Sequence, residues 1–112
     1  MKQTSIRRGD IFWVDFDPSK ATEIQKKRPS LVFSHDLMNE NSSRIIVAPI
    51  TSNIKKIYSF EYAIKDHKNV TGKIMLDQMR SIDKSRLGEK LGHFSIKEMQ
   101  EIEVILKFIL GI

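Results

Sequence analysis

The sequence contains no cysteine, and this absence removes several kinds of chemistry at once. Disulfide bonds, thiolate nucleophiles and cysteine-based zinc sites are all excluded. The three histidines, His35, His67 and His93, show no spacing typical of metal ligands. We therefore expect a protein that uses no metal and no other cofactor, and the lack of cysteine is compatible with a reducing cytoplasm.

Long hydrophobic runs are also missing. No stretch approaches the roughly 20 apolar residues that a membrane-spanning helix needs, and no apolar run follows the basic residues of the N-terminus. The chain has no repeats or low-complexity segments. Its 112 residues suffice for one hydrophobic core and are too few for two. We expect a single domain over residues 1–112, with no membrane partner and a cytoplasmic location.

Basic residues outnumber acidic ones. The chain has 19 Lys and Arg against 14 Asp and Glu, which gives a net charge of +5 and a pI near 9.6. This balance favours nucleic acid or another acidic partner through the long-range field. Because many small basic domains bind no nucleic acid, charge alone is weak support for such a function.

Several short segments have the β-branched and aromatic composition of strands. They cover residues 11–16, 30–34, 44–50, 59–64 and 73–82. Within residues 59–64, one face of a half-buried strand is expected to carry Phe60, Tyr62 and Ile64, and the other Ser59, Glu61 and Ala63. Strict alternation along residues 73–82 would separate two faces in the same way, and a bulge would change them.

The C-terminal region predicts one long helix. Ser95 and Glu98 have the spacing of a capping box, and Gly111 marks the end. An apolar stripe at spacings of three and four contains Ile96, Met99, Ile102, Ile105, Leu106 and Ile109. Val104 and Phe108 lie off this stripe, so part of the helix surface is expected to meet a second subunit.

The remaining connections are short. A helical turn with Ser34 as N-cap is one interpretation of residues 35–43, although their asparagines and serines favour a wide connection. Asp83 could cap a short turn before a small final strand in residues 88–94. The fold class is therefore mainly β (α+β), an antiparallel sheet curled into a small barrel with a C-terminal helix. A doubly wound α/β fold would need helices between the strands.

Candidate functional residues gather near two predicted strand ends. Arg28 precedes Pro29, which restricts the backbone of the arginine to extended geometry and places its guanidinium to hold an anion. Thr51 and Ser52 end the strand of residues 44–50, at a position where loops often carry chemistry. If the two ends meet, they form a polar site.

Four segments in order carry a resemblance to a known family. They are RGDIFWVDFDPSKATE, RPSLVFS, APITS and LDQMRSID, within residues 7–87. Together they resemble the MazF/PemK family of toxin–antitoxin ribonucleases. The resemblance implies an SH3-like, CcdB-like barrel that forms a homodimer. It also implies metal-independent, sequence-specific cleavage of single-stranded RNA, and inhibition by an antitoxin whose flexible tail wraps the dimer.

The same resemblance assigns residues to the site. Arg28 and Thr51 match family positions implicated in cleavage, Glu23 matches a loop glutamate proposed as base, and Asp77 matches an acidic residue of PemK-like members. Met75 stands where those members have a second arginine. The loop of residues 21–26 also lacks the two glycines that the family commonly has, so its conformation and the RNA sequence preference stay open.

The residues suit metal-free RNA cleavage, which needs a base, an acid and positive charge for the phosphorane. Arg28 can donate two parallel hydrogen bonds to phosphate, or it is a surface arginine paired with an acid. Thr51 could bond a phosphate oxygen or only the backbone, and Glu23 is either the base or a solvated glutamate. The expected substrate contacts are Lys20, Lys26, Lys27, Ser52, Lys55, Lys56, Asp77 and Gln78.

Other interpretations stay open at this point. Trp13 and Phe16 could stack on bases, but strand aromatics are more often core residues. His35 and His93 could serve as the acid because histidine as a residue type exchanges protons near neutrality, but neither lies in a matched motif. The alternative function is a CcdB-like gyrase-binding toxin or a barrel that binds nucleic acid without cutting it. The Arg28-Pro29 pair and the strand-end hydroxyls favour the nuclease.

Overall fold

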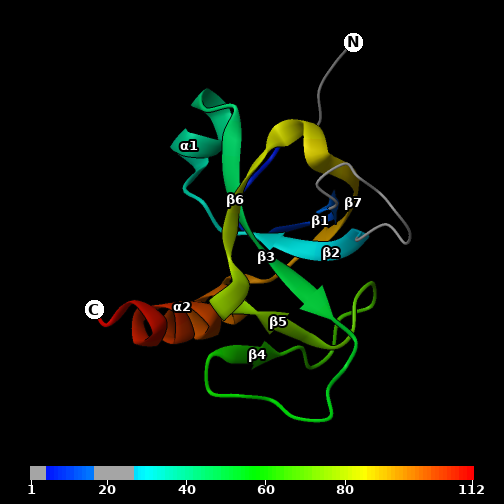
Figure 1. Cartoon of the computed structure of the whole chain (residues 1–112), viewed down its shortest axis with the longest axis vertical. Helices are drawn as coiled ribbons and strands as arrows, with labels where there is room; N and C mark the ends of the chain where they lie inside the picture. Colours follow the sequence, from blue (N-terminus) through cyan, green and yellow to red (C-terminus); the bar gives the residue numbers. More distant parts are fainter. Residues whose placement is uncertain (1–4, 17–26) are drawn as a thin grey trace.

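The computed structural model describes residues 5–16 and 27–112, which form a curled β-sheet with one long helix beside it (Figure 1). The strands are β1 (Asp10–Asp15), β2 (Lys27–Val32), β3 (Arg44–Thr51), β4 (Glu61–Ala63), β5 (Lys73–Met75), β6 (Arg80–Asp83) and β7 (Leu87–His93). The helices are α1 (Asp36–Asn41) and α2 (Ile96–Leu110), with short 3-10 turns η1 (Leu76–Gln78) and η2 (Lys84–Arg86). The sequence-based prediction of a mainly β fold with a C-terminal helix is confirmed.

Strand β3 organises the sheet, whose order is β4-β5-β3-β2-β1-β7 with β6 paired to β3. All the strand pairs are antiparallel. On one edge β3 pairs with β2; on the other it pairs with β6 over residues 44–47 and with β5 over residues 50–51. The end of β3 that carries Thr51 therefore meets both β2 and β5.

The prediction of one strand over residues 73–82 is wrong. The chain forms β5, then the turn η1, then β6. The break has a structural reason, because β5 and β6 pair with different halves of β3 and the chain must step from one half to the other. Ile74 and Leu76 are buried as alternation predicts, but Gln78 and Arg80 are exposed.

The sheet is buried on two faces. One cluster contains Ile11, Leu31 and Ile50 from the strands and Met99 and Ile102 from α2. The second contains Phe12, Val14, Val32, Ile45, Val47 and Ile82. The neighbours Ile11 and Phe12 of β1 belong to different clusters, because successive side chains of a strand point to opposite faces.

The capping box and the end of α2 are confirmed. The Ser95 hydroxyl accepts from the backbone N–H of Glu98 at 3.1 Å, and the Glu98 carboxylate accepts from the N–H of Ser95 at 2.8 Å. Gly111 ends the helix with a φ of 72°. The placement of Ile96 on the buried stripe is wrong: this residue is 80% exposed, and the buried residues of α2 are Met99 and Ile102, one and two turns further on.

The short connections also differ in detail. The N-cap of α1 is His35, whose Nδ1 accepts from the N–H of Leu37 at 3.0 Å. Ser34 is buried instead, and its hydroxyl bonds to the Asn39 side chain and accepts from the N–H of Ile46. Because its hydroxyl bonds to Asn39 and to β3, Ser34 does not cap α1 as predicted. The cap of η2 by Asp83 is confirmed.

Glu61 is buried, contrary to the alternation expected over residues 59–64. Its carboxylate accepts from Lys73 Nζ at 2.8 Å and from the Tyr58 N–H at 2.9 Å, while Lys73 Nζ also donates to the Lys56 carbonyl at 2.7 Å. This pair makes burial of the charges tolerable and fastens residues 56–58 to β4 and β5.

In the described part of the chain no helix is long and apolar enough to span a membrane.

Candidate RNA-binding site

A cavity of about 370 Å³ lies at the end of β3. It is lined by Trp13, Lys27, Arg28, Pro29, Ile50, Ser52, Asn69, Val70, Thr71 and Leu91. The strand register explains why Arg28 of β2 lies near the end of β3. Trp13 pairs with Pro29 and Ser30 pairs with Pro49, so continuing the β2–β3 register sets Arg28 across from Thr51. The two predicted strand ends do meet.

Arg28 has the properties of an anion ligand. Its side chain is exposed, and among residues 5–16 and 27–112 it makes no ion pair with a carboxylate. The alternative of a surface arginine paired with an acid finds no support there. Lys27 lines the same cavity, so two adjacent positive charges face it. A catalytic role for Arg28 stays a prediction.

The two hydroxyls at the end of β3 have different surroundings. Ser52 lines the cavity, whereas Thr51 does not. The Thr51 hydroxyl accepts from the N–H of Asn53 at 3.2 Å, which matches the alternative of a threonine bonded to backbone. Because a hydroxyl both accepts and donates, this bond leaves the Thr51 proton available to another acceptor.

The turn before β5 supplies cavity residues that the sequence interpretation missed. Asn69 and Thr71 both line the cavity, and the Asn69 amide donates to the Leu91 carbonyl at 2.6 Å. Gly72, with a φ of 111°, brings the turn this close: a Cβ there would stand 2.0 Å from the Thr51 carbonyl oxygen. That glycine was the only signal in the sequence.

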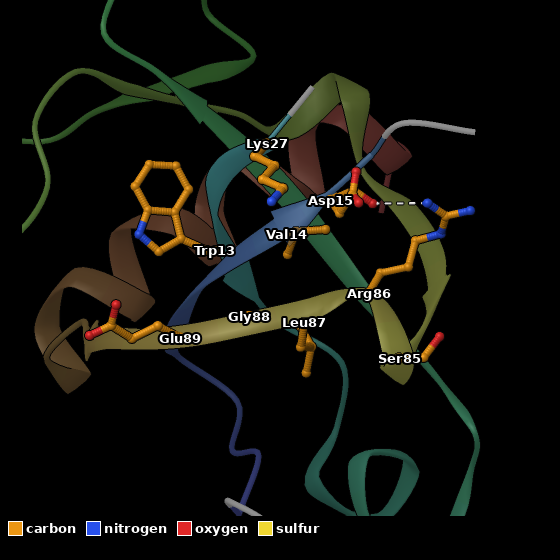
Figure 2. A pocket seen from close by; sticks show the side chains of 9 residues that line it. All are labelled: Trp13, Val14, Asp15, Lys27, Ser85, Arg86, Leu87, Gly88 and Glu89. Carbon is orange, nitrogen blue, oxygen red and sulfur yellow. Dashed lines mark hydrogen bonds between the residues drawn. The ribbon is translucent and has the colours of Figure 1, made fainter. Parts of the chain in front are cut away.

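Trp13 belongs to the site rather than to the interior. Its side chain is 38% exposed, so the interpretation as a core residue is wrong. It also lines a second cavity of about 380 Å³, whose lining residues from β1 and β7 are shown in Figure 2. Lys27 lines both cavities. None of the described residues that line either cavity comes from α2.

Several predicted site residues do not line either cavity. Lys55 and Lys56 lie in the connection between β3 and β4, with Lys56 Nζ 5.0 Å from the centre of the Tyr58 ring. Asp77 and Gln78 are exposed on η1. The predictions for Glu23, Lys20 and Lys26 fall outside the described residues. All of these roles stay predictions.

Three groups have a shifted pKa and none of them lines either cavity, although Asp83 contacts Ser85, which lines the second one. The pKa of Asp36 is lowered chiefly by a hydrogen bond from the Arg8 backbone, and that of Asp83 by one from the Ser85 backbone. Burial, then the Glu101 carboxylate, raise the pKa of Tyr62. Within the described ranges, no three His, Asp or Glu side chains come together as a metal site.

Comparison with known proteins agrees with this geometry. Residues 7–110 match the family of PemK-like, MazF-like toxins of type II toxin–antitoxin systems. Endoribonuclease MazF9 of Mycobacterium tuberculosis is 36% identical over 110 residues, covering 91% of this chain and 93% of the relative.

Solved structures show the same fold. MazF from Deinococcus radiodurans superposes with a TM-score of 0.83 at 30% identity, over 98% of this chain and all of that one. A MazE–MazF complex from the same organism gives 0.85 at 29% identity, over 98% and 99%. A mycobacterial endoribonuclease bound to its cognate antitoxin gives 0.80 at 20% identity, over 98% and 97%. Because residues 7–110 of its 112 residues match the family, this chain belongs to the PemK/MazF toxins of type II toxin–antitoxin systems.

Proposed function

We propose that this toxin cuts single-stranded messenger RNA at short sequences without a metal ion, and that Arg28 holds the phosphate being cut. RNA cleavage is the activity of the family, and the 36% identical relative is an endoribonuclease. The mechanism is our proposal. The observation that carries it is the exposed Arg28 guanidinium, without an acidic partner among the described residues, on the wall of a cavity that also contains Lys27 and Ser52.

The chemistry needs only the RNA's own hydroxyl as nucleophile. The 2′-oxygen attacks the adjacent phosphorus, the bond from phosphorus to the 5′-oxygen breaks, and a 2′,3′-cyclic phosphate and a 5′-hydroxyl result. The 2′-proton passes to a base, for which Glu23 is our candidate, and an acid protonates the departing 5′-oxygen. Arg28 stabilises the additional negative charge on the phosphorane through parallel N–H donors, and Ser52 or Thr51 adds a hydroxyl donor.

The test is cleavage of a mixed-sequence RNA by the purified protein in EDTA. We expect cutting to continue and the products to carry a cyclic phosphate and a 5′-hydroxyl. Replacing the 2′-hydroxyl at the cut site should abolish cleavage. A requirement for Mg²⁺, or equal cutting of DNA, contradicts the mechanism. Binding of RNA without any cutting would instead favour the non-catalytic barrel.

We also propose that two chains form a twofold dimer, the commonest closed arrangement. Val104 is 68% and Phe108 63% exposed on α2, followed by exposed Leu110 and Ile112. An apolar strip of this kind fits a second copy better than water. Light scattering should give about 26 kDa, twice the 13.0 kDa of one chain. A monomer at micromolar concentration contradicts this proposal.

The partner that controls the toxin is, we propose, an antitoxin with a flexible acidic segment. Relatives have been solved with antitoxins bound, and the net charge of +5 attracts an acidic chain as it attracts RNA. Such a segment orders on binding and excludes RNA from the basic surface. The place of action would be the cytoplasm, where messenger RNA is found. Both RNA and antitoxin binding should weaken steeply with added salt.

A further inference from the structure

The second cavity beside Trp13 has a structure that the cleavage mechanism does not use. Trp13 forms one wall, and Arg86 and Asp15 stand opposite it (Figure 2). The Arg86 guanidinium donates to the Asp15 carbonyl at 3.1 Å, which holds that wall in place. Val14 also lines the cavity, although it is only 1% exposed.

Gly88 keeps the indole accessible from this side. It lines the cavity, and a Cβ at this position would stand 3.3 Å from Trp13 Cβ. A larger side chain would therefore crowd Trp13 at its Cβ and occupy part of the cavity. Gly88 does not adopt a left-handed φ. A glycine is therefore needed here for the room it leaves and not for its backbone conformation.

Strand register ties this cavity to the phosphate site. Trp13 pairs with Pro29, the neighbour of Arg28, and Trp13 and Lys27 line both cavities. A nucleotide whose phosphate lies against Arg28 would thus have a flat aromatic surface and a lysine next to it. Single-stranded RNA is commonly recognised by stacking of unpaired bases on aromatic side chains within a positively charged path.

We infer that the cavity between Trp13 and Arg86 holds the base of a nucleotide next to the cut phosphate, stacked on the Trp13 indole. This inference rests on the proposed RNA cleavage and adds a base-binding subsite to it. The cavity is lined by two cations, Lys27 and Arg86, and by two acids, Asp15 and Glu89. What favours a nucleotide over an apolar peptide side chain is therefore the aromatic face of Trp13 beside Lys27, which also lines the cavity of Arg28. An antitoxin side chain in the cavity is the competing outcome.

The experiment uses the fact that Trp13 is the only tryptophan of the chain. Its fluorescence is followed while the wild-type protein is titrated with an RNA made uncleavable by a 2′-O-methyl group at the mapped cut site. We expect saturable quenching. A series of RNAs with one abasic nucleotide each should lose the quenching at one position next to the cut, with affinity, measured by anisotropy, reduced about 10-fold.

Variants give a second, independent measurement. Trp13→Phe keeps an aromatic face and should bind the RNA within about 2-fold of wild type, whereas Trp13→Leu should bind about 10-fold more weakly. Gly88→Val should reproduce the weaker binding by filling the cavity. Melting curves establish that each variant is folded. If a variant does not fold, the abasic series on the wild-type chain still decides.

Quenching that no abasic position changes would overturn the subsite. So would quenching by an antitoxin peptide but not by RNA, which would make the cavity a peptide site. Failure of the proposed function is distinct from both, because it shows as wild-type protein that cuts no RNA. Binding and quenching are measured on uncleavable RNA and do not depend on cutting.

Discussion

One face of strand β1 is buried at one end and exposed at the other. Ile11 and Trp13 are two residues apart on β1 and therefore point to the same side. At Ile11 this side is covered by α2 and is 0% exposed, while at Trp13 it is open and 38% exposed. The covered end provides stability, and the open end provides two cavities, an arginine and an aromatic surface. A strand pattern alone does not distinguish these ends, because the difference comes from what lies above them.

The largest expected effect concerns the buried ion pair between β4 and β5. Lys73→Met leaves the Glu61 carboxylate buried without its partner, and Lys73 and Glu61 are each only 8% exposed. We expect a loss of about 3–5 kcal/mol in the free energy of unfolding, measured in urea. The double variant Glu61→Leu/Lys73→Met should recover most of it. If the single variant unfolds like wild type, the pair does not stabilise the fold.

Next in size is a change at the covered end. Ile102 is 0% exposed beneath the sheet, so Ile102→Ala should lower the free energy of unfolding by about 2–5 kcal/mol. The matched control is Ile96→Ala in the same helix, because Ile96 is 80% exposed. Below the melting temperature, RNA cleavage by the folded variant should be unchanged. Equal effects of both substitutions would contradict the observed packing of α2.

At the open end, a substitution should reduce RNA cleavage and leave the stability of the fold unchanged. Arg28→Ala should reduce kcat/KM for RNA by a factor equivalent to about 2–4 kcal/mol of transition-state stabilisation, with the melting temperature unchanged because Arg28 is exposed. Thr51→Ala should lose less, since the Thr51 hydroxyl already accepts a backbone N–H. Wild-type cleavage by Arg28→Ala would place the site elsewhere.

The smallest effect is a pH dependence at the covered end. The Tyr62 hydroxyl donates to Glu101 of α2 at 2.7 Å, and burial raises the pKa of Tyr62 above its usual value. A raised pKa means that this contribution to stability is complete below about pH 10, the value for an unfolded tyrosine. It is lost as the pH rises further. Melting temperatures between pH 8 and 11 should fall more for wild type than for Tyr62→Phe. Parallel curves would show that Tyr62 contributes nothing to the alkaline loss.

The sequence determined features that depend on near neighbours. Ser95 and Glu98 specify the start of α2 because the capping box closes within one turn. The composition of β1, β2 and β3 specifies strands, and Arg28-Pro29 and Thr51-Ser52 identify the strand ends that meet. Local chemistry decides these features, so they can be predicted without knowledge of the rest of the chain.

Only the tertiary structure decided where the predicted strands break, which of their residues are buried and which residues join the site. Residues 73–82 break at η1 because β5 and β6 pair with different halves of β3, a long-range constraint that alternation cannot show. Glu61 is buried because Lys73, twelve residues away, neutralises it. Trp13 is exposed and lies outside the cluster that contains Met99 and Ile102 of α2. Asn69 and Thr71 join the site because Gly72 allows the turn to approach Thr51. Each outcome depends on contacts between distant segments, which the order of residues alone does not specify.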